Sequence, residues 1–138
     1  MHITLESDYA VRITGFLAAE NARIDAKKIS ESTGVSLRFA LKILRKLVAS
    51  GIVTSYKGAQ GGYELAKMPA EITLRDVIDS IEGQYCLSRC LDGEFVCTHT
   101  ASPCCTYQKI FREVSELVNE KLESYNFEEI LKQSQGKE

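Results

Sequence analysis

The chain has 138 residues, is 44% hydrophobic and carries a formal net charge of −2, which suits one domain, or one small domain with a dimerising extension. No apolar run approaches the roughly 20 residues that a membrane-spanning helix needs. The first segment, MHITLESDYAVR, has acids and lacks the basic-then-apolar layout of a signal peptide. We therefore expect a cytoplasmic protein with no membrane partner, where clustered thiols more often bind metal or do redox chemistry than form disulfides.

Charge is distributed unevenly along the chain. Residues 1–68 contain ten Lys/Arg and six Asp/Glu, a balance of +4, whereas residues 69–138 contain seven and thirteen, a balance of −6. This asymmetry favours a basic half that binds a polyanion and an acidic half with a different role. Uneven surface charge on a single globule is the alternative.

The first elements predict a helix-turn-helix. A helix is expected over 5–20, where four apolar residues share one face: Tyr9, Ile13, Phe16 and Leu17. A short helix over 26–32 is capped by Asp25 and ends before Gly34, since glycine commonly follows a helix end. A longer helix follows over 37–50. Two helices joined by a short turn that contains glycine form the helix-turn-helix layout.

A β-hairpin follows the second of these helices. IVTSY at 52–56 is rich in β-branched and aromatic residues, GAQGG at 58–62 is a turn, and YEL at 63–65 returns as the second strand. A hairpin in this place converts a helix-turn-helix into a winged helix. Residues 1–68 are therefore predicted to form a winged-helix DNA-binding domain, in a chain that is mainly α-helical with a small β wing.

The second half of the chain is predicted to be a helix, a loop and a long helix. The connecting segment 69–85 holds a helix over 74–82, and the stretch 86–105 has no periodicity. A long amphipathic helix is expected over 106–124, followed by a final turn or two that Asn126 caps and a frayed tail. The apolar stripe of the long helix is Ile110, Val114, Leu117, Val118 and Leu122.

The helix over 37–50 has the pattern of a recognition helix. Its apolar stripe, Leu37, Leu41, Leu44 and Val48, is expected to pack against the domain. Its opposite side is expected to face water and carries four cations and no acid. A solvated face is the alternative for a lone helix, but the helix-turn-helix and wing favour a major groove, where Arg and Lys contact phosphates and guanine. The wing offers Lys57 and Gln60, and its glycines allow close approach to a phosphate. The candidate DNA contacts are Ser36, Arg38, Phe39, Lys42, Arg45, Lys46, Lys57, Gln60, Gly61 and Gly62.

All five cysteines lie in CLSRCLDGEFVCTHTASPCC at 86–105. No C-x2-C pair is present, so a zinc ribbon and a thioredoxin-like motif fit poorly. The wider gaps suit an iron–sulfur cluster held by thiolates. Of the adjacent pair Cys104 and Cys105, we expect one ligand, at the start of the long helix where the helix dipole favours thiolate. A thiol-rich loop without metal and a zinc site are the alternatives.

With these parts placed, the chain resembles a family of bacterial winged-helix regulators that includes IscR, NsrR, RirA and CymR. The resemblance is carried by T-x-E-S-D-Y-A-V-R at 4–12, by SLRFALKILRKLVASGIV at 36–53, by the wing at 55–66 and by ITLRDVIDSIEG at 72–83. It implies a homodimer that pairs through the long helix in segment 106–138 and binds a pseudo-palindromic operator on double-stranded DNA.

The resemblance also implies a set of cluster ligands. It places three loop cysteines at Cys90, Cys97 and Cys105, with Cys104 as the rival for the third place and a 2Fe–2S cluster slightly favoured over 4Fe–4S. The histidine that IscR uses three residues after its third cysteine is absent, and Gln108 or Tyr107 stands there. NsrR-like members use a carboxylate of the N-terminal helix, supplied by the partner subunit, and Asp8 occupies that position. His99 and Cys86 are the other candidates, and Asp8 also suits a first helical turn for electrostatic reasons alone.

The sequence therefore predicts a homodimeric transcriptional regulator, a repressor, controlled by an iron–sulfur cluster that senses iron, redox state or nitric oxide. The alternative is a winged-helix regulator without a cluster, controlled by cysteine oxidation or by a partner protein. An enzyme is not expected, because the sequence shows no pairing of a nucleophile with a base, and neither is a small-molecule substrate. An electron carrier would have no need for a basic winged helix.

Overall fold

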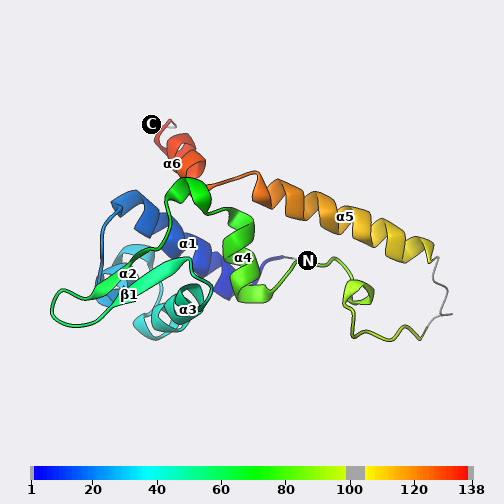
Figure 1. Ribbon diagram of the computed structural model, residues 1–138, viewed down its shortest axis with the longest axis horizontal. Coiled ribbons are helices and arrows are strands. Elements are labelled where there is room, and N and C mark those ends of the chain that lie inside the picture. Colours follow the sequence, from blue (N-terminus) through cyan, green and yellow to red (C-terminus); the bar gives the residue numbers. More distant parts are fainter. Residues whose placement is uncertain (1, 99–104, 137–138) are drawn as a thin grey trace.

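Helix α1 (Leu5–Glu20) lies at the centre of the N-terminal body in the computed structural model, which describes residues 2–98 and 105–136 (Figure 1). Thr4 caps the helix by accepting a hydrogen bond from the Ser7 amide at 3.1 Å. At the other end Asn21 closes it in the left-handed conformation, with φ of 47°. The predicted apolar face is confirmed. Ile13 and Leu17 are buried in the core, and Tyr9 and Phe16 are partly buried against it.

The predicted helix-turn-helix is confirmed. Helix α2 (Ala26–Thr33) starts after Asp25, whose carboxylate accepts from the Lys28 amide at 2.8 Å, and ends at Gly34, with φ of 73°. Helix α3 (Leu37–Ala49) follows after a short turn. Both boundaries lie where the capping residues predicted them, because caps satisfy local backbone groups and depend little on distant contacts.

The predicted buried stripe of α3 was partly wrong. Leu37 and Leu41 are 45% and 39% exposed. The buried residues of α3 are Ala40, Ile43, Leu44 and Leu47. Apolar residues surround much of this helix, so helical spacing fits two overlapping stripes equally well, and packing against α1 and α4 selects the second.

The wing consists of β1 (Val53–Tyr56) and β2 (Gly62–Leu65), which pair antiparallel with Tyr56 opposite Gly62. A third backbone segment extends this hairpin on its inner side. Ile24, between α1 and α2, donates to the Tyr63 carbonyl at 2.9 Å and accepts from the Tyr63 amide at 2.8 Å. The wing is thus attached to the body by backbone hydrogen bonds that the sequence analysis did not predict.

The connecting segment holds a 3₁₀ turn, η1 (Pro69–Glu71), and helix α4 (Leu74–Glu82). Thr73 and Asp76 form a reciprocal capping box at the start of α4. Val77 is fully buried against the body. Helix α4 therefore belongs to the same core as α1 and α3.

Helix α5 (Thr106–Glu123) extends from the body as an arm, with the loop that contains η2 (Arg89–Leu91) below its first turns (Figure 1). The buried residues of α5 are polar, Ser115 and Asn119. The Ser115 hydroxyl accepts from the Leu87 amide at 2.8 Å, and the Asn119 amide donates to the Tyr85 carbonyl at 3.2 Å. These bonds hold the segment after α4 along the arm.

Helix α6 (Phe127–Gln135) returns the chain to the body. Asn126 caps it by accepting from the Glu129 amide at 2.9 Å, as predicted, but the helix continues beyond the expected turn or two. Phe127 is 1% exposed, within the core that α1 organises. None of the helices in the described parts of the chain is long and apolar enough to cross a membrane.

Replacing Phe127 with alanine should show that α6 belongs to the core. We expect Phe127→Ala to lower the free energy of unfolding by about 3–5 kcal/mol, because it leaves a cavity in a packed site. Met68→Ala, at a residue that is 68% exposed, is the control and should change it by less than about 0.5 kcal/mol. Urea unfolding measures both, and equal stability of the two variants would contradict the assignment of α6 to the core.

Candidate nucleic-acid interface and cysteine loop

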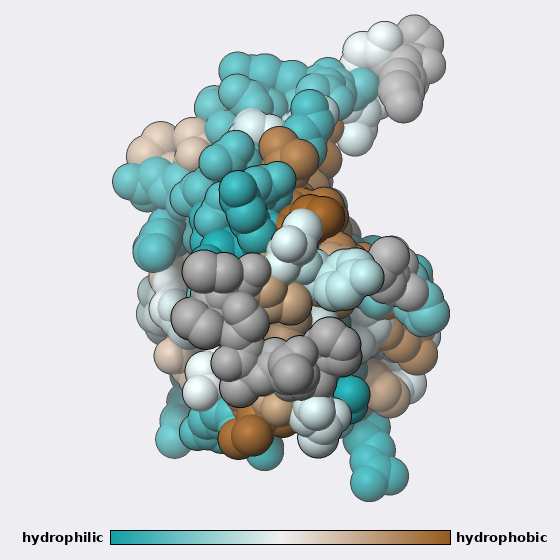
Figure 2. All heavy atoms as spheres, turned by 90° about the vertical axis from the view of Figure 1, so that its right-hand side faces the viewer, coloured by the Kyte–Doolittle hydropathy of each residue, from teal (hydrophilic) through white to brown (hydrophobic). Residues whose placement is uncertain are grey.

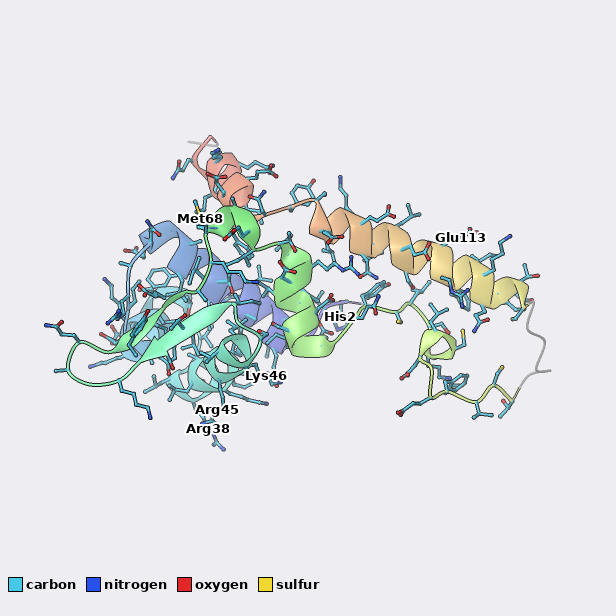
Figure 3. The ribbon with its side chains drawn as sticks, in the orientation of Figure 1. His2, Arg38, Arg45, Lys46, Met68 and Glu113 are labelled. Carbon is cyan, nitrogen blue, oxygen red and sulfur yellow. The ribbon has the colours of Figure 1, made fainter. Side chains whose placement is uncertain are left out.

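Two arginines of α3 are exposed on one side of the body. Arg38 and Arg45 project from the helix away from the core, and Lys46 lies on the same helix (Figure 3). Neither arginine forms an ion pair within the described residues. A planar guanidinium that is free in this way can bind a phosphate or the edge of a guanine with two hydrogen bonds.

The two lysines of α3 are in a different state. Lys42 and Lys46 donate to the two carboxylate oxygens of Glu6 in α1, at 2.6 Å and 2.7 Å. These hydrogen bonds, from Lys42 first and then Lys46, lower the pKa of Glu6 to about 2. Helix α3 itself carries no acid, but in the folded chain α1 supplies one from 36 residues away.

Ser36 and Phe39, both predicted to contact DNA, have structural roles at the start of α3. The Ser36 hydroxyl accepts from the Phe39 amide at 3.3 Å and caps the helix. The Phe39 ring meets the Tyr9 ring edge-to-face, with centroids 5.6 Å apart. These contacts fix where α3 begins, which sets the direction of its exposed side chains.

Arg23 supports the wing, a role that no motif or spacing in the sequence indicated. Its guanidinium lies 3.4 Å from the centroid of the Tyr56 ring and donates to the Gln60 carbonyl at 3.3 Å. Glu64 lies 3.8 Å from the same guanidinium, and a hydrogen bond to Glu64 raises the pKa of the Tyr56 phenol. Lys57 and Gln60 remain exposed at the tip.

The wing glycines are required by the protein's own backbone. A Cβ atom on Gly62 would lie 2.7 Å from the Ile24 carbonyl oxygen, and Gly62 has φ of 147°. A Cβ atom on Gly61 would lie 2.4 Å from the Tyr56 carbonyl oxygen. Gly62 is also buried. A glycine is therefore needed here so that the wing can pack against the body, whereas the sequence analysis explained the wing glycines by close approach to a phosphate.

The cysteine loop is tied to the first turn of α5. The Gln108 side chain donates to the Cys90 carbonyl at 3.0 Å, and the Cys90 thiol lies 3.2 Å from the Ser88 hydroxyl. Cys105 is the residue just before α5. Gln108 occupies the position at which IscR has a histidine ligand. In this chain its side chain instead holds the backbone of Cys90, one of the candidate ligands.

The four cysteines that the structure describes are free thiols. Cys86 and Cys97 are exposed, and Cys90 and Cys105 are half-buried. Cys104 and His99 lie outside the described residues. Free thiols are the donors that an iron–sulfur cluster takes, so the donor chemistry fits such a cluster.

The candidate ligands that the structure describes are not gathered into one site. Residues 2–98 and 105–136 contain no group of three or more His, Cys, Asp or Glu side chains placed to hold a metal ion. Asp8 lies on the surface of α1, where its carboxylate accepts from the Arg12 guanidinium at 2.8 Å. Arg12 also donates to the Thr33 carbonyl at 3.1 Å. The described residues therefore fit an iron–sulfur cluster by the type of their donor atoms, thiol sulfurs, and not by an assembled geometry.

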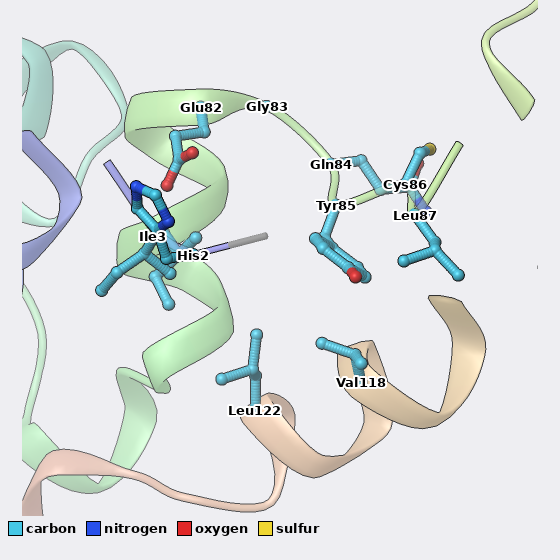
Figure 4. Close-up of a pocket in the computed structure, with 11 residues that line it drawn as sticks. His2, Ile3, Glu82, Gly83, Gln84, Tyr85, Cys86, Leu87, Val118 and Leu122 are labelled. Atoms are coloured by element: carbon cyan, nitrogen blue, oxygen red, sulfur yellow. The ribbon is translucent and has the colours of Figure 1, made fainter. Parts of the chain in front are cut away.

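An apolar cavity of about 520 Å³ separates α5 from the body (Figure 4). It lies between the end of α4, the segment 83–87 and the apolar side of α5, from which Val118 and Leu122 point into it. On the side of the molecule that Figure 2 shows, apolar surface lies in a hollow between more hydrophilic regions. Further along α5, Ile110 and Leu117 are 47% and 66% exposed.

A helix-turn-helix with a hairpin directly behind it and exposed cations on its second helix defines a winged-helix DNA-binding protein. Residues 3–133 match the family model Rrf2, described as an iron-dependent transcriptional regulator. The chain belongs to this family of DNA-binding transcriptional regulators.

Individual relatives agree with this assignment. The protein Aau3 of Rhizobium meliloti is 31% identical over 134 residues, which cover 96% of this chain and 86% of the relative. The regulator NsrR of Bacillus licheniformis is 28% identical and the match covers 95% and 92% of the two chains. Among solved structures, IscR of T. potens matches with a TM-score of 0.76 at 25% identity over 97% and 88% of the chains. CymR of B. subtilis matches in fold, with a TM-score of 0.75 at 23% identity over 94% and 95%.

Substitution of Gly62 should loosen the wing. We expect Gly62→Ala to destabilise the protein by about 2 kcal/mol or more, because the new Cβ collides with the Ile24 backbone and φ is unfavourable. Gly93→Ala is the control, since a Cβ there meets nothing within 4 Å. Urea unfolding and proteolysis of the wing measure the effect. If both variants are as stable as the parent, the close packing of the wing on the body is refuted.

Proposed function

We propose that the protein is a homodimeric repressor that binds a pseudo-palindromic operator through α3 and the wing, under the control of an iron–sulfur cluster. The main observation in support of DNA binding is that Arg38 and Arg45 are exposed on α3. In winged-helix proteins the corresponding helix enters the major groove. Lys57 and Gln60, which are exposed on the wing, would contact the DNA backbone or the minor groove beside it. As a bacterial regulator it would act in the cytoplasm, where the DNA lies.

The proposed dimer forms through α5. The arm exposes Ile110 and Leu117 on its apolar side while burying only polar residues against its own chain. An amphipathic helix with an exposed apolar stripe favours a partner helix. Pairing two arms would bring two copies of α3 to half-sites about one helical turn of DNA, 10–10.5 base pairs, apart.

Cys90, Cys97 and Cys105 are the proposed cysteine ligands, with Cys104 as the rival of Cys105 and Asp8 of the partner copy as the fourth. When bound, a cluster supplies a centre that responds to oxygen, nitric oxide or iron supply. The Gln108 side chain ties the backbone of Cys90 to the first turn of α5, the helix that Cys105 precedes. To act as a ligand, Asp8 would exchange its ion pair with Arg12 for iron. The family description as iron-dependent supports this proposal.

A cysteine switch without a cluster is the second candidate. It is favoured by one observation: Cys86, Cys90, Cys97 and Cys105 are free thiols, two of them exposed, and no metal-binding group is formed among the described residues. Exposed thiols can be oxidised reversibly to sulfenic acid or a disulfide. Mass spectrometry of protein exposed to peroxide would reveal a reproducible disulfide if this candidate is right. In either case we propose a binding protein and assign no catalytic residue.

Removing one arginine of α3 tests the DNA-binding face. We expect Arg45→Ala to weaken binding to duplex DNA about fivefold to tenfold at 0.1 M salt and to reduce the slope of log K against log salt by about 0.9, the effect of one phosphate contact. Lys132→Ala on α6 is the control with the same loss of charge and should have little effect. Fluorescence anisotropy over a salt series measures both. Equal weakening by the two variants would argue against α3.

Iron and acid-labile sulfide should be present in protein purified without oxygen. We expect Cys97→Ala to lose both together with the visible absorption, and Cys86→Ala to keep them, because only the former removes a proposed ligand. Asp8→Ala should make the absorption bleach faster in air, since the harder carboxylate ligand would be missing. Colourless parent protein that binds DNA equally well with and without Cys97 would rule out the cluster.

A further inference from the structure

Glu6 lies between the two lysines of the recognition helix. Its carboxylate oxygens accept one hydrogen bond each, from Lys42 at 2.6 Å and from Lys46 at 2.7 Å. The Glu6 side chain is 24% exposed, and those of Lys42 and Lys46 are 55% and 38% exposed. The contact is therefore at the surface, where an incoming anion can reach both ammonium groups.

The geometry of this contact is that of a phosphate held by two lysines. Each ammonium group donates to a separate oxygen of one anion, as two lysines one helical turn apart would donate to a DNA phosphate. While Glu6 is in place, one negative charge offsets two positive charges on the side of α3 that faces DNA. Arg38 and Arg45 have no such acid within the described residues, so the four cations of α3 fall into a free pair and an occupied pair.

We propose that Glu6 is a built-in competitor of DNA, which occupies the place of a phosphate on Lys42 and Lys46 and so weakens binding to DNA of arbitrary sequence. This inference rests on the proposed role of α3 as the DNA-binding face. When DNA binds, a phosphate oxygen takes over the hydrogen bonds of the lysines and the Glu6 carboxylate is released to solvent.

The opposite role, in which Glu6 orients the lysines and stays in place, is disfavoured by charge. A carboxylate that kept both lysines would lie beside the phosphates that they approach, and like charges at that distance repel. Exchange removes this repulsion. The competition therefore acts on the phosphate contacts of Lys42 and Lys46, which carry no sequence information.

Substitution of Glu6 by glutamine tests the exchange. With a mixed-sequence duplex of about 30 base pairs, three helical turns, Glu6→Gln should bind about fivefold to tenfold more tightly than the parent at 0.1 M salt, with a slope of log K against log salt steeper by about 0.9. Glu20→Gln is the matched control, since Glu20 lies exposed at the far end of the same helix and its loss changes the net charge equally. The inference is overturned if Glu6→Gln binds no more tightly than Glu20→Gln, or more weakly than the parent.

A double-mutant cycle separates this inference from the proposed function. In a Lys42→Ala background the gain from Glu6→Gln should shrink to about half or less of its value on a logarithmic scale, since one of the two released cations is missing. If Lys42→Ala weakens binding but Glu6→Gln changes nothing, the competitor role fails while α3 remains the DNA-binding face. If Lys42→Ala and Arg45→Ala both leave binding unchanged, α3 is not that face and both proposals fail.

A second variant guards against a change in folding. Glu6→Asp keeps the charge but shortens the side chain by one methylene, so it should bind DNA with an affinity between those of the parent and Glu6→Gln. Thermal unfolding of each variant, followed by circular dichroism, confirms that the helices remain. An affinity of Glu6→Asp equal to that of Glu6→Gln would contradict the requirement for a carboxylate that reaches both lysines.

Discussion

The first three turns of α1 hold the N-terminal body together. The Ser7 hydroxyl donates to the Glu82 carboxylate at the end of α4, and the Thr4 amide donates to the same carboxylate at 3.3 Å. One turn on, the Arg12 guanidinium donates to the Thr33 carbonyl at the end of α2. With Glu6 bound to the lysines of α3, one short stretch contacts three other helices. The apolar core that these helices share fixes the position of α3 and hence the direction of its cations, and the polar contacts of Ser7, Thr4 and Arg12 hold α1 against α4 and α2 above that core.

The proposed DNA-binding face and the arm are connected by few elements. Helix α4 lies in the core of the body through Val77, and the segment after it is held to α5 by the Ser115 and Asn119 side chains. Residues 1–68, which contain α3 and the wing, have the basic balance of the chain, and residues 69–138 have the acidic one. This arrangement separates a face suited to a polyanion from an arm suited to a second copy, and the part of the cysteine loop around η2 lies near the outer end of the arm (Figure 1).

The helices and strands could be predicted from local features of the sequence. The contacts between elements far apart in the sequence could not. Caps such as Asp25 and Asn126 satisfy neighbouring backbone groups, so they could be recognised from the sequence. The buried face of α3 could not, because Leu37 and Leu41 are as apolar as the residues that the core selects. The ion pairs of Glu6 with α3 and the contacts of Arg23 with the wing depend on how the helices pack. Residue spacing in the sequence does not predict that packing. The proposed gathering of the cysteines would depend in addition on a metal and a second copy, which the sequence of one chain does not describe.

The central claim is that α3 and the wing form the surface that binds DNA. Acetylation of lysines, followed residue by residue by mass spectrometry with and without duplex DNA, tests it within one unaltered protein. The account predicts that DNA protects Lys42, Lys46 and Lys57, whereas Lys121 on α5 and Lys132 on α6 react equally in both states. Equal reaction of the first three lysines with and without DNA, or protection confined to α5 and α6, would contradict it.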